Sequence, residues 1–193
     1  MVLGDTEPSE KQKQVKRRME EHASNQISEV SESNHALEDS EQVLDNLLNA
    51  GEYEKAGEVF KELKTLKIHS EKNGFEQEAE KWSEITGRFK EEAKEIQQEK
   101  KEECRSEIEE AEQLEDKIHE NIVSHEAAEG ISGAPVKNEF KAVKKDLEES
   151  KSDIKDIITI AHKFDLERET KEDAHELEIE WNNAKRTLEK LES

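Results

Sequence analysis

The sequence predicts an all-α fold: two tandem antiparallel three-helix bundles joined by a continuous helix. Three observations indicate this. Apolar residues recur every three or four positions, Gly and Pro are scarce, and the two tryptophans, Trp82 and Trp181, stand 99 residues apart (181 − 82) in similar acidic frames. Of the 193 residues, 42% are charged and 31% hydrophobic, and the net charge is −21. This composition suits long helices that each bury a narrow apolar stripe.

The ordered spacing of the apolar residues excludes the alternative of a disordered acidic chain. Between residues 136 and 164 an unbroken heptad seam steps by four and three, with one polar member. Its positions are Val136, Phe140, Val143, Leu147, Ser150, Ile154, Ile157, Ala161 and Phe164. The last segment repeats the pattern at Ala174, Leu177, Trp181, Ala184, Leu188 and Leu191.

A few breaks divide the helical pattern. Turns are expected at 129–136 (EGISGAPV), at 69–75 (HSEKNGF, with Asn73-Gly74) and near 165–170. Thr170 and Asp173 resemble a capping box with Asp in place of Glu, which predicts that Thr170 caps the last helix. Pro8 stands where the first helix can start. These turns argue against one long parallel coiled coil.

The 99-residue offset predicts an internal duplication, with copies at 8–98 and 99–193. In the middle helix the match slips by one residue, which an insertion near Gly51 would explain as a kink or a short break. Between the copies, residues 75–128 contain one Gly and no Pro, so we expect a connecting helix of about 80 Å. Its centre, QQEKKEE at 97–103, has no apolar residue and is expected to be solvated and bendable.

The stretch NAGEYEKAGEVFKEL (49–63) offers a competing interpretation, because it resembles the second half of a tetratricopeptide repeat. Such repeats need several copies to share a core, and no second copy is evident. A kink or break at Gly51 in the middle helix of the first copy is the simpler explanation.

The tryptophan frames EKWSEITGRF and IEWNNAKRTL resemble the third helix of the spectrin repeat, and this likeness extends to the repeat length and the helical linker. The resemblance implies that Trp82 and Trp181 anchor the two cores. One feature departs from the family: a second tryptophan is usual in its first helix, where this chain offers Met19 and Ile118.

What the resemblance implies about function is a non-enzymatic structural and scaffolding protein, a spacer and protein-interaction module of the cytoskeleton or of nuclear-envelope linkage. The expected partners are cytoskeletal proteins, such as actin or spectrin-like chains, and membership of a larger assembly is compatible with this. The expected location is cytoplasmic and cytoskeleton-associated, with the nuclear envelope as an alternative; no targeting segment is visible.

Other classes of function find little support. The acidity opposes nucleic-acid binding and a membrane-shaping role, and no apolar run is long enough to span a membrane. We expect no enzyme, metal or cofactor. Cys104 is the single cysteine and sits in a helical frame that offers it no catalytic base. Glu172-x-x-His175 has di-iron spacing but no second copy of the motif.

The alternative function is a helical adaptor that binds an anionic membrane or an acidic partner through the basic segment 11–18 (KQKQVKRR). The basic residues of this segment are Lys11, Lys13, Lys16, Arg17 and Arg18. They could instead complement acidic faces within the bundle itself.

Overall fold

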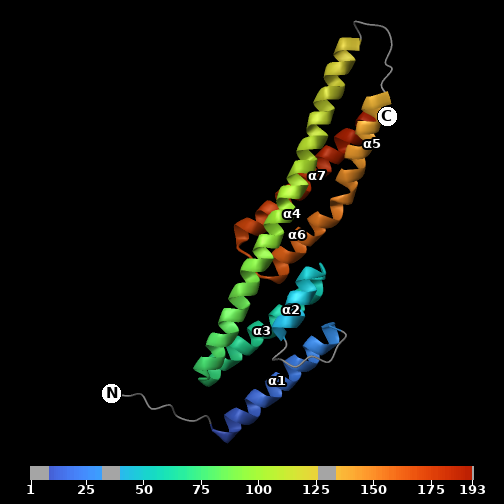
Figure 1. Cartoon of the computed structure of the whole chain (residues 1–193). Helices are drawn as coiled ribbons and strands as arrows, with labels where there is room; N and C mark the ends of the chain where they lie inside the picture. Colours follow the sequence, from blue (N-terminus) through green and yellow to red (C-terminus); the bar gives the residue numbers. More distant parts are fainter. Residues whose placement is uncertain (1–8, 32–39, 126–133, 193) are drawn as a thin grey trace. The chain divides into compact units, whose positions relative to one another are not determined.

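The computed structural model describes residues 9–31, 40–125 and 134–192, and its regular secondary structure there is helical (Figure 1). The predicted all-α class is confirmed. The helices are α1 (Glu10–Ser31), α2 (Ser40–Asn49), α3 (Tyr53–Asn73), α4 (Glu76–His125), α5 (Ala134–Glu149), α6 (Lys151–Lys163) and α7 (Arg168–Glu192). The predicted loop at 129–136 lies outside the described residues, except for its last three, which belong to α5.

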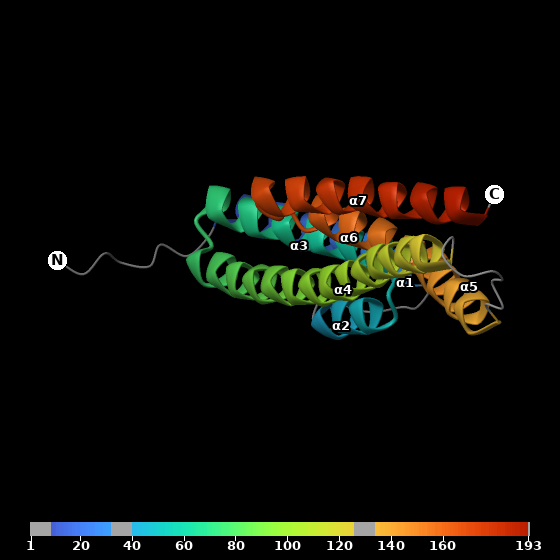
Figure 2. The same ribbon diagram turned by 90° about the horizontal axis from the view of Figure 1, so that it is seen from above.

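The chain divides into two compact units. Unit 1 comprises the chain up to Lys94 together with His162–Leu166, and unit 2 comprises Glu95–Ala161 together with the chain from Glu167 on. The 50-residue helix α4 supplies residues to both units and is one unbroken ribbon in each view, as the expected continuous helix requires (Figure 2). That the chain forms two compact units does not show that the units are copies of each other. The predicted duplication, with copies at 8–98 and 99–193, therefore stays a prediction.

The start of α1 is fixed by a capping box that follows Pro8. The backbone N–H of Gln12 donates to Ser9 Oγ at 3.3 Å, and the backbone N–H of Ser9 donates to Gln12 Oε1 at 2.8 Å. Two N–H groups at the helix start, which have no partner in the helix ladder, are thereby satisfied.

Glycines in the left-handed region end two helices of unit 1. Gly51 has φ +72° and separates α2 from α3, so the middle segment has a short break rather than a kink. Gly74, also at φ +72°, ends α3: its N–H donates to Glu71 O, and the N–H of Phe75 donates to Ser70 O. The turn predicted from Asn73-Gly74 is confirmed.

The second half of the chain differs from prediction at two helix boundaries. The seam at 136–164 is divided between α5 and α6 at Ser150. The predicted cap at Thr170 is wrong, because α7 already begins at Arg168 and Thr170 lies in its first turn. Asp165, at φ 49°, makes the preceding turn; aspartate is one of the few residues other than glycine that adopt this conformation readily.

The segment His162–Leu166 completes the core of unit 1. Phe164 is fully buried, and its ring centroid lies 5.0 Å from that of Phe60 on α3. Lys163 Nζ lies 2.5 Å from a carboxylate oxygen of Glu54. The backbone of α3 comes close to this segment at Gly57, where a Cβ would stand 2.3 Å from Lys163 Cβ.

We therefore expect Gly57→Ala to lower the free energy of unfolding of unit 1 by about 1–3 kcal/mol, because the added methyl group overpacks this contact. Gly87→Ala is the matched control. It replaces a glycine on α4 whose Cβ would meet nothing within 4 Å, so it should raise stability by about 0.5–1 kcal/mol through helix propensity. Urea unfolding followed by Trp82 fluorescence in a Trp181→Phe background measures both, and equal effects would contradict the close approach.

Candidate functional site

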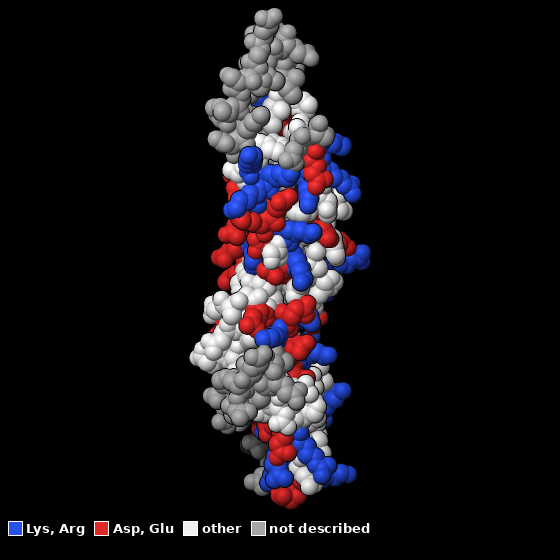
Figure 3. All heavy atoms as spheres, turned by 90° about the vertical axis from the view of Figure 1, so that its right-hand side faces the viewer, with Lys and Arg blue, Asp and Glu red and all other residues white. Residues whose placement is uncertain are grey.

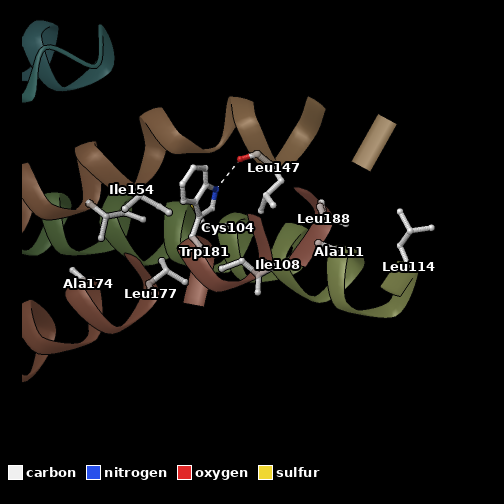
Figure 4. Packing of buried hydrophobic residues seen from close by; sticks show 12 residues of the cluster. Cys104, Ile108, Ala111, Leu114, Leu147, Ile154, Ala174, Leu177, Trp181 and Leu188 are labelled. Atoms are coloured by element: carbon white, nitrogen blue, oxygen red, sulfur yellow. Dashed lines mark hydrogen bonds between the residues drawn. The ribbon is translucent and has the colours of Figure 1, made fainter. Parts of the chain in front are cut away.

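Trp181 lies at the centre of the unit 2 core (Figure 4). The indole is 3% exposed, and its Nε1–H donates to Leu147 O at 2.7 Å and to Ser150 Oγ at 3.2 Å. The Ser150 hydroxyl in turn donates to Leu147 O at 2.9 Å. The one polar position of the predicted seam thus serves as a hydrogen-bond partner for the tryptophan, where the chain passes from α5 to α6.

Trp82 occupies a buried position on α4 in unit 1, where it is 6% exposed. Lys81 Nζ lies 4.8 Å from the centroid of its ring, and the Thr86 hydroxyl donates to its backbone carbonyl at 2.7 Å. Trp181 has comparable cationic neighbours in Lys151 and Lys185, at 5.8 and 5.4 Å. Both tryptophans therefore combine a buried ring with a lysine over one face.

At the centre of α4, Gln97, Lys100 and Lys101 form a polar layer that packs against neighbouring helices. The expectation that 97–103 is solvated is wrong for these three positions and holds for the other four, which are exposed. Gln97 is 1% exposed and donates from Nε2 to Ile157 O at 2.9 Å. Lys101, whose side chain is 4% exposed, places Nζ 3.4 Å from an Asp173 carboxylate and 3.5 Å from Thr170 O. Long polar side chains can bury their stems while their ends reach partners on neighbouring helices, so a stretch without apolar residues still packs.

Lys100 belongs to the same layer but faces α6, whereas Lys101 faces α7. The ammonium group of Lys100 pairs with Asp153 and lies 3.3 Å from Asp156, both on α6. Two adjacent lysines of α4 thus pair with carboxylates on two different helices. The sequence carried a signal for this arrangement. Asp153, Asp156 and Asp173 each stand directly before a seam position of α6 or α7, where they can meet lysines from another helix.

Cys104 is a core residue of unit 2. Its side chain is fully buried, with Sγ 3.9 Å from Ser150 O. Burial, together with the charges of Asp153 and Glu107, raises its pKa to about 12. The reactive thiolate is therefore scarce at neutral pH.

Glu107 is the poorly satisfied carboxylate of this region. Its Oε2 atom is buried without a hydrogen-bond partner in the part of the chain that the structure describes. Burial first, and then the nearby Asp153, raise its pKa above the ordinary value. A side-chain hydrogen bond with Ser150 lowers the pKa of Glu107 and so offsets part of this rise.

The basic segment of α1 is largely engaged within its own unit. Lys13 pairs with Glu10 and Arg17 pairs with Glu21, and Lys16 bonds Glu78 on α4. The last of these contacts lowers the pKa of Glu78. Charges of both signs are mixed over the face drawn in Figure 3.

Four members of the segment, Lys11, Lys13, Arg17 and Arg18, are exposed on α1, and Lys16 is half-buried. A role for Lys11, Lys13, Lys16, Arg17 and Arg18 in partner binding therefore stays a prediction. No arrangement of these side chains favours it over pairing within the unit.

The candidate metal residues lie apart from any cluster. Among the residues that the structure describes, no group of three His, Cys, Asp or Glu side chains could hold a metal ion. Glu172 Oε1 accepts from Arg168 Nε at 2.6 Å, and His175 lies 3.6 Å from Glu178. No described helix is long and apolar enough to cross a membrane.

Comparison of the chain with family models, with curated proteins and with solved structures found no match. The resemblance to the spectrin repeat therefore stays a prediction. Function has to be argued from the geometry of the two units.

Trp181→Ala should lower the free energy of unfolding of unit 2 by about 3–5 kcal/mol, because it removes a buried ring and leaves a cavity. Trp82→Ala should do the same for unit 1. Ile179→Ala is the control on α7, since Ile179 is 62% exposed and its loss should change stability by less than about 0.5 kcal/mol. Urea unfolding followed by circular dichroism measures the loss, and the remaining tryptophan reports the unit that is not mutated. A loss for Trp181→Ala no larger than for Ile179→Ala would show that the ring does not anchor the core.

Glu107→Gln should stabilise unit 2 at neutral pH. Because the folded pKa is raised, the favourable contribution of the protonated group is complete below about pH 4.5, its ordinary pKa, and is lost as the pH rises through the folded pKa. Glutamine stays neutral, so we expect a gain of about 1 kcal/mol at pH 7, which shrinks in acid. Chemical denaturation at both pH values, with the exposed Glu110→Gln as control, measures this difference. The same gain in both variants would point to the net charge of the chain instead.

Proposed function

We propose that this chain is a non-enzymatic structural spacer and protein-interaction module made of two related three-helix units of the spectrin-repeat type. The observation that carries the proposal is helix α4, which continues without a break for 50 residues and supplies buried side chains to both units. A helix of this length spans about 75 Å. Two units that share one rigid helix suit a spacer, because bending between them requires breaking backbone hydrogen bonds.

The pattern of burial supports two copies of one unit. Trp82 and Trp181 are both buried, and so are the residues that follow each of them on the same helix face at the 99-residue offset. These pairs are Ile85 with Ala184, and Phe89 with Leu188. The offset joins structurally similar positions, as a duplicated unit requires.

Unit 2 supports the three-helix arrangement most directly. Its core cluster draws side chains from three stretches of chain: the second half of α4, the α5–α6 pair and α7. Unit 1 has the corresponding stretches in α1, the α2–α3 pair and the first half of α4, and α3 contacts both α1 and α2. The segment His162–Leu166 is an addition that unit 2 does not mirror.

A role without catalysis is consistent with the environment of the reactive groups. Cys104 is held in its protonated form, and Lys100 and Lys101 of α4 pair with carboxylates on neighbouring helices. The resemblance to the spectrin repeat supports cytoskeletal partners, such as actin or spectrin-like chains, and a cytoplasmic or nuclear-envelope location. These remain parts of the proposal.

Small-angle X-ray scattering combined with light scattering tests the spacer. We expect a monomer with a maximum dimension of at least about 75 Å, since α4 alone has that length. Glu95→Pro should break α4 between the units and broaden the distribution of interatomic distances, whereas Glu95→Ala should not. Both tryptophans should stay buried in the proline variant. A shorter particle, an obligate dimer, or identical scattering from the two variants would remove the spacer role.

A further inference from the structure

Unit 1 carries a hollow of about 400 Å³ that lies between α3 and α4. Ile68 of α3 contributes exposed apolar surface to it, and the buried rings of Phe60 and of Phe164, from the segment His162–Leu166, lie beneath. Gly87 and Lys90 line it from α4. The hollow therefore lies over two buried aromatic rings, and its α4 wall has a gap at Gly87, between the side chains of Thr86 and Lys90.

Ile68 makes the edge of this hollow apolar. Its side chain is 45% exposed, although most large apolar residues of the unit are buried. Ile68 also lines a second hollow, of about 600 Å³, where Gln26 and Ile27 of α1 approach α3. An exposed isoleucine between two hollows offers apolar area that a partner can cover.

Gly87 has no explanation within the described part of the chain. A glycine inside a helix costs about 1 kcal/mol relative to alanine, and here an added Cβ would meet no atom within 4 Å. Gly57 differs, because Lys163 occupies the space that its Cβ would need. Since Gly87 lines the hollow, its missing side chain would allow the backbone of another molecule to approach α4 closely.

The charges at the hollow favour an acidic partner. Lys67 on α3 and Lys90 on α4 both line it and pair with no other described residue, whereas Lys64 is paired with Asp165. With Glu71 and Asp165 included, the lining carries three lysines and two acidic residues, in a chain whose net charge is −21. Charges farther away than about 8 Å are largely screened at physiological ionic strength. The excess of lysine in the lining therefore decides which sign of charge the hollow attracts.

We propose that this hollow binds an acidic amphipathic helix of a partner protein. An apolar side chain of that helix enters the hollow against Phe60, Ile68 and Phe164, its backbone passes over Gly87, and a carboxylate pairs with Lys67 and Lys90. A second copy of this chain is disfavoured, because two molecules of charge −21 repel each other. The inference rests on the proposed role as an interaction module and specifies its class of partner.

The test uses the whole chain and a display library of helical peptides about four turns long. Leucine is fixed at positions i, i+3, i+4 and i+7, and all other positions vary among acidic, basic and neutral polar residues. Selection on the wild-type chain should enrich peptides with Asp or Glu beside the leucine face. Their affinity, measured by fluorescence anisotropy, should fall with added salt and by tenfold or more on Gly87→Leu, on Ile68→Glu and on Lys67→Gln with Lys90→Gln.

Matched variants separate loss of binding from loss of folding. Gly87→Leu should unfold at the same temperature as the wild type or higher, since leucine favours helix more than glycine does. Ile179→Glu controls for Ile68→Glu, because Ile179 is also exposed but lies on α7 in unit 2. It should leave binding unchanged.

Three results would overturn the inference: no enrichment, enrichment of basic or neutral peptides, or binding that survives Gly87→Leu. Peptides whose binding is lost on Ile179→Glu and kept on Ile68→Glu would also refute this hollow, although they would leave the interaction module standing. A dimer in light scattering that Ile68→Glu dissociates would assign the hollow to a second copy instead. The peptide results leave the scattering test of the spacer untouched, whereas an obligate dimer would also remove the spacer role.

Discussion

Helix α4 is the element on which the rest of the structure depends. The chain has too few apolar residues for a thick core, so each helix can bury only a narrow stripe. On α4 that stripe continues for 50 residues and meets different helices in the two units. In unit 1 it places Trp82 and Phe89 in the core, and in unit 2 it places Cys104, Ile108 and Leu114 there. Both cores therefore take one of their walls from the same helix.

Much of this fold could be predicted from the sequence, because it depends on local rules. Heptad spacing located the helices, and Gly51 and Gly74 marked breaks that only a left-handed residue could make. The turn at Asp165 was harder, since aspartate takes that conformation less often than glycine and gives no distinctive signal. The division of the seam at Ser150 was missed for a similar reason, because a serine at a seam position does not itself indicate a helix end.

Some candidate sites could likewise be predicted from the sequence, and others could not. Both tryptophans could be identified as core residues from their spacing, because a large apolar residue at a seam position is expected to be buried between helices. The hollow of unit 1 could not, since Phe60 and Phe164 are far apart in the sequence and only the tertiary fold brings their rings together. The lysines at its walls looked like ordinary solvated charges. Gly87 was visible in the sequence as an unfavourable residue inside a long helix, but the sequence did not show that it lines a hollow.

The polar layer at the centre of α4 gives unit 2 a property that its apolar seams lack. A regular heptad seam can slide by seven residues against its partners and still bury similar side chains, so it specifies register weakly. Gln97, Lys100 and Lys101 remove that freedom, because each has its acceptor at one position on α6 or α7. Any slip would leave buried polar groups unpaired, which costs more than the net gain from making the contacts. The layer therefore contributes mainly to the choice of one arrangement of the helices within unit 2.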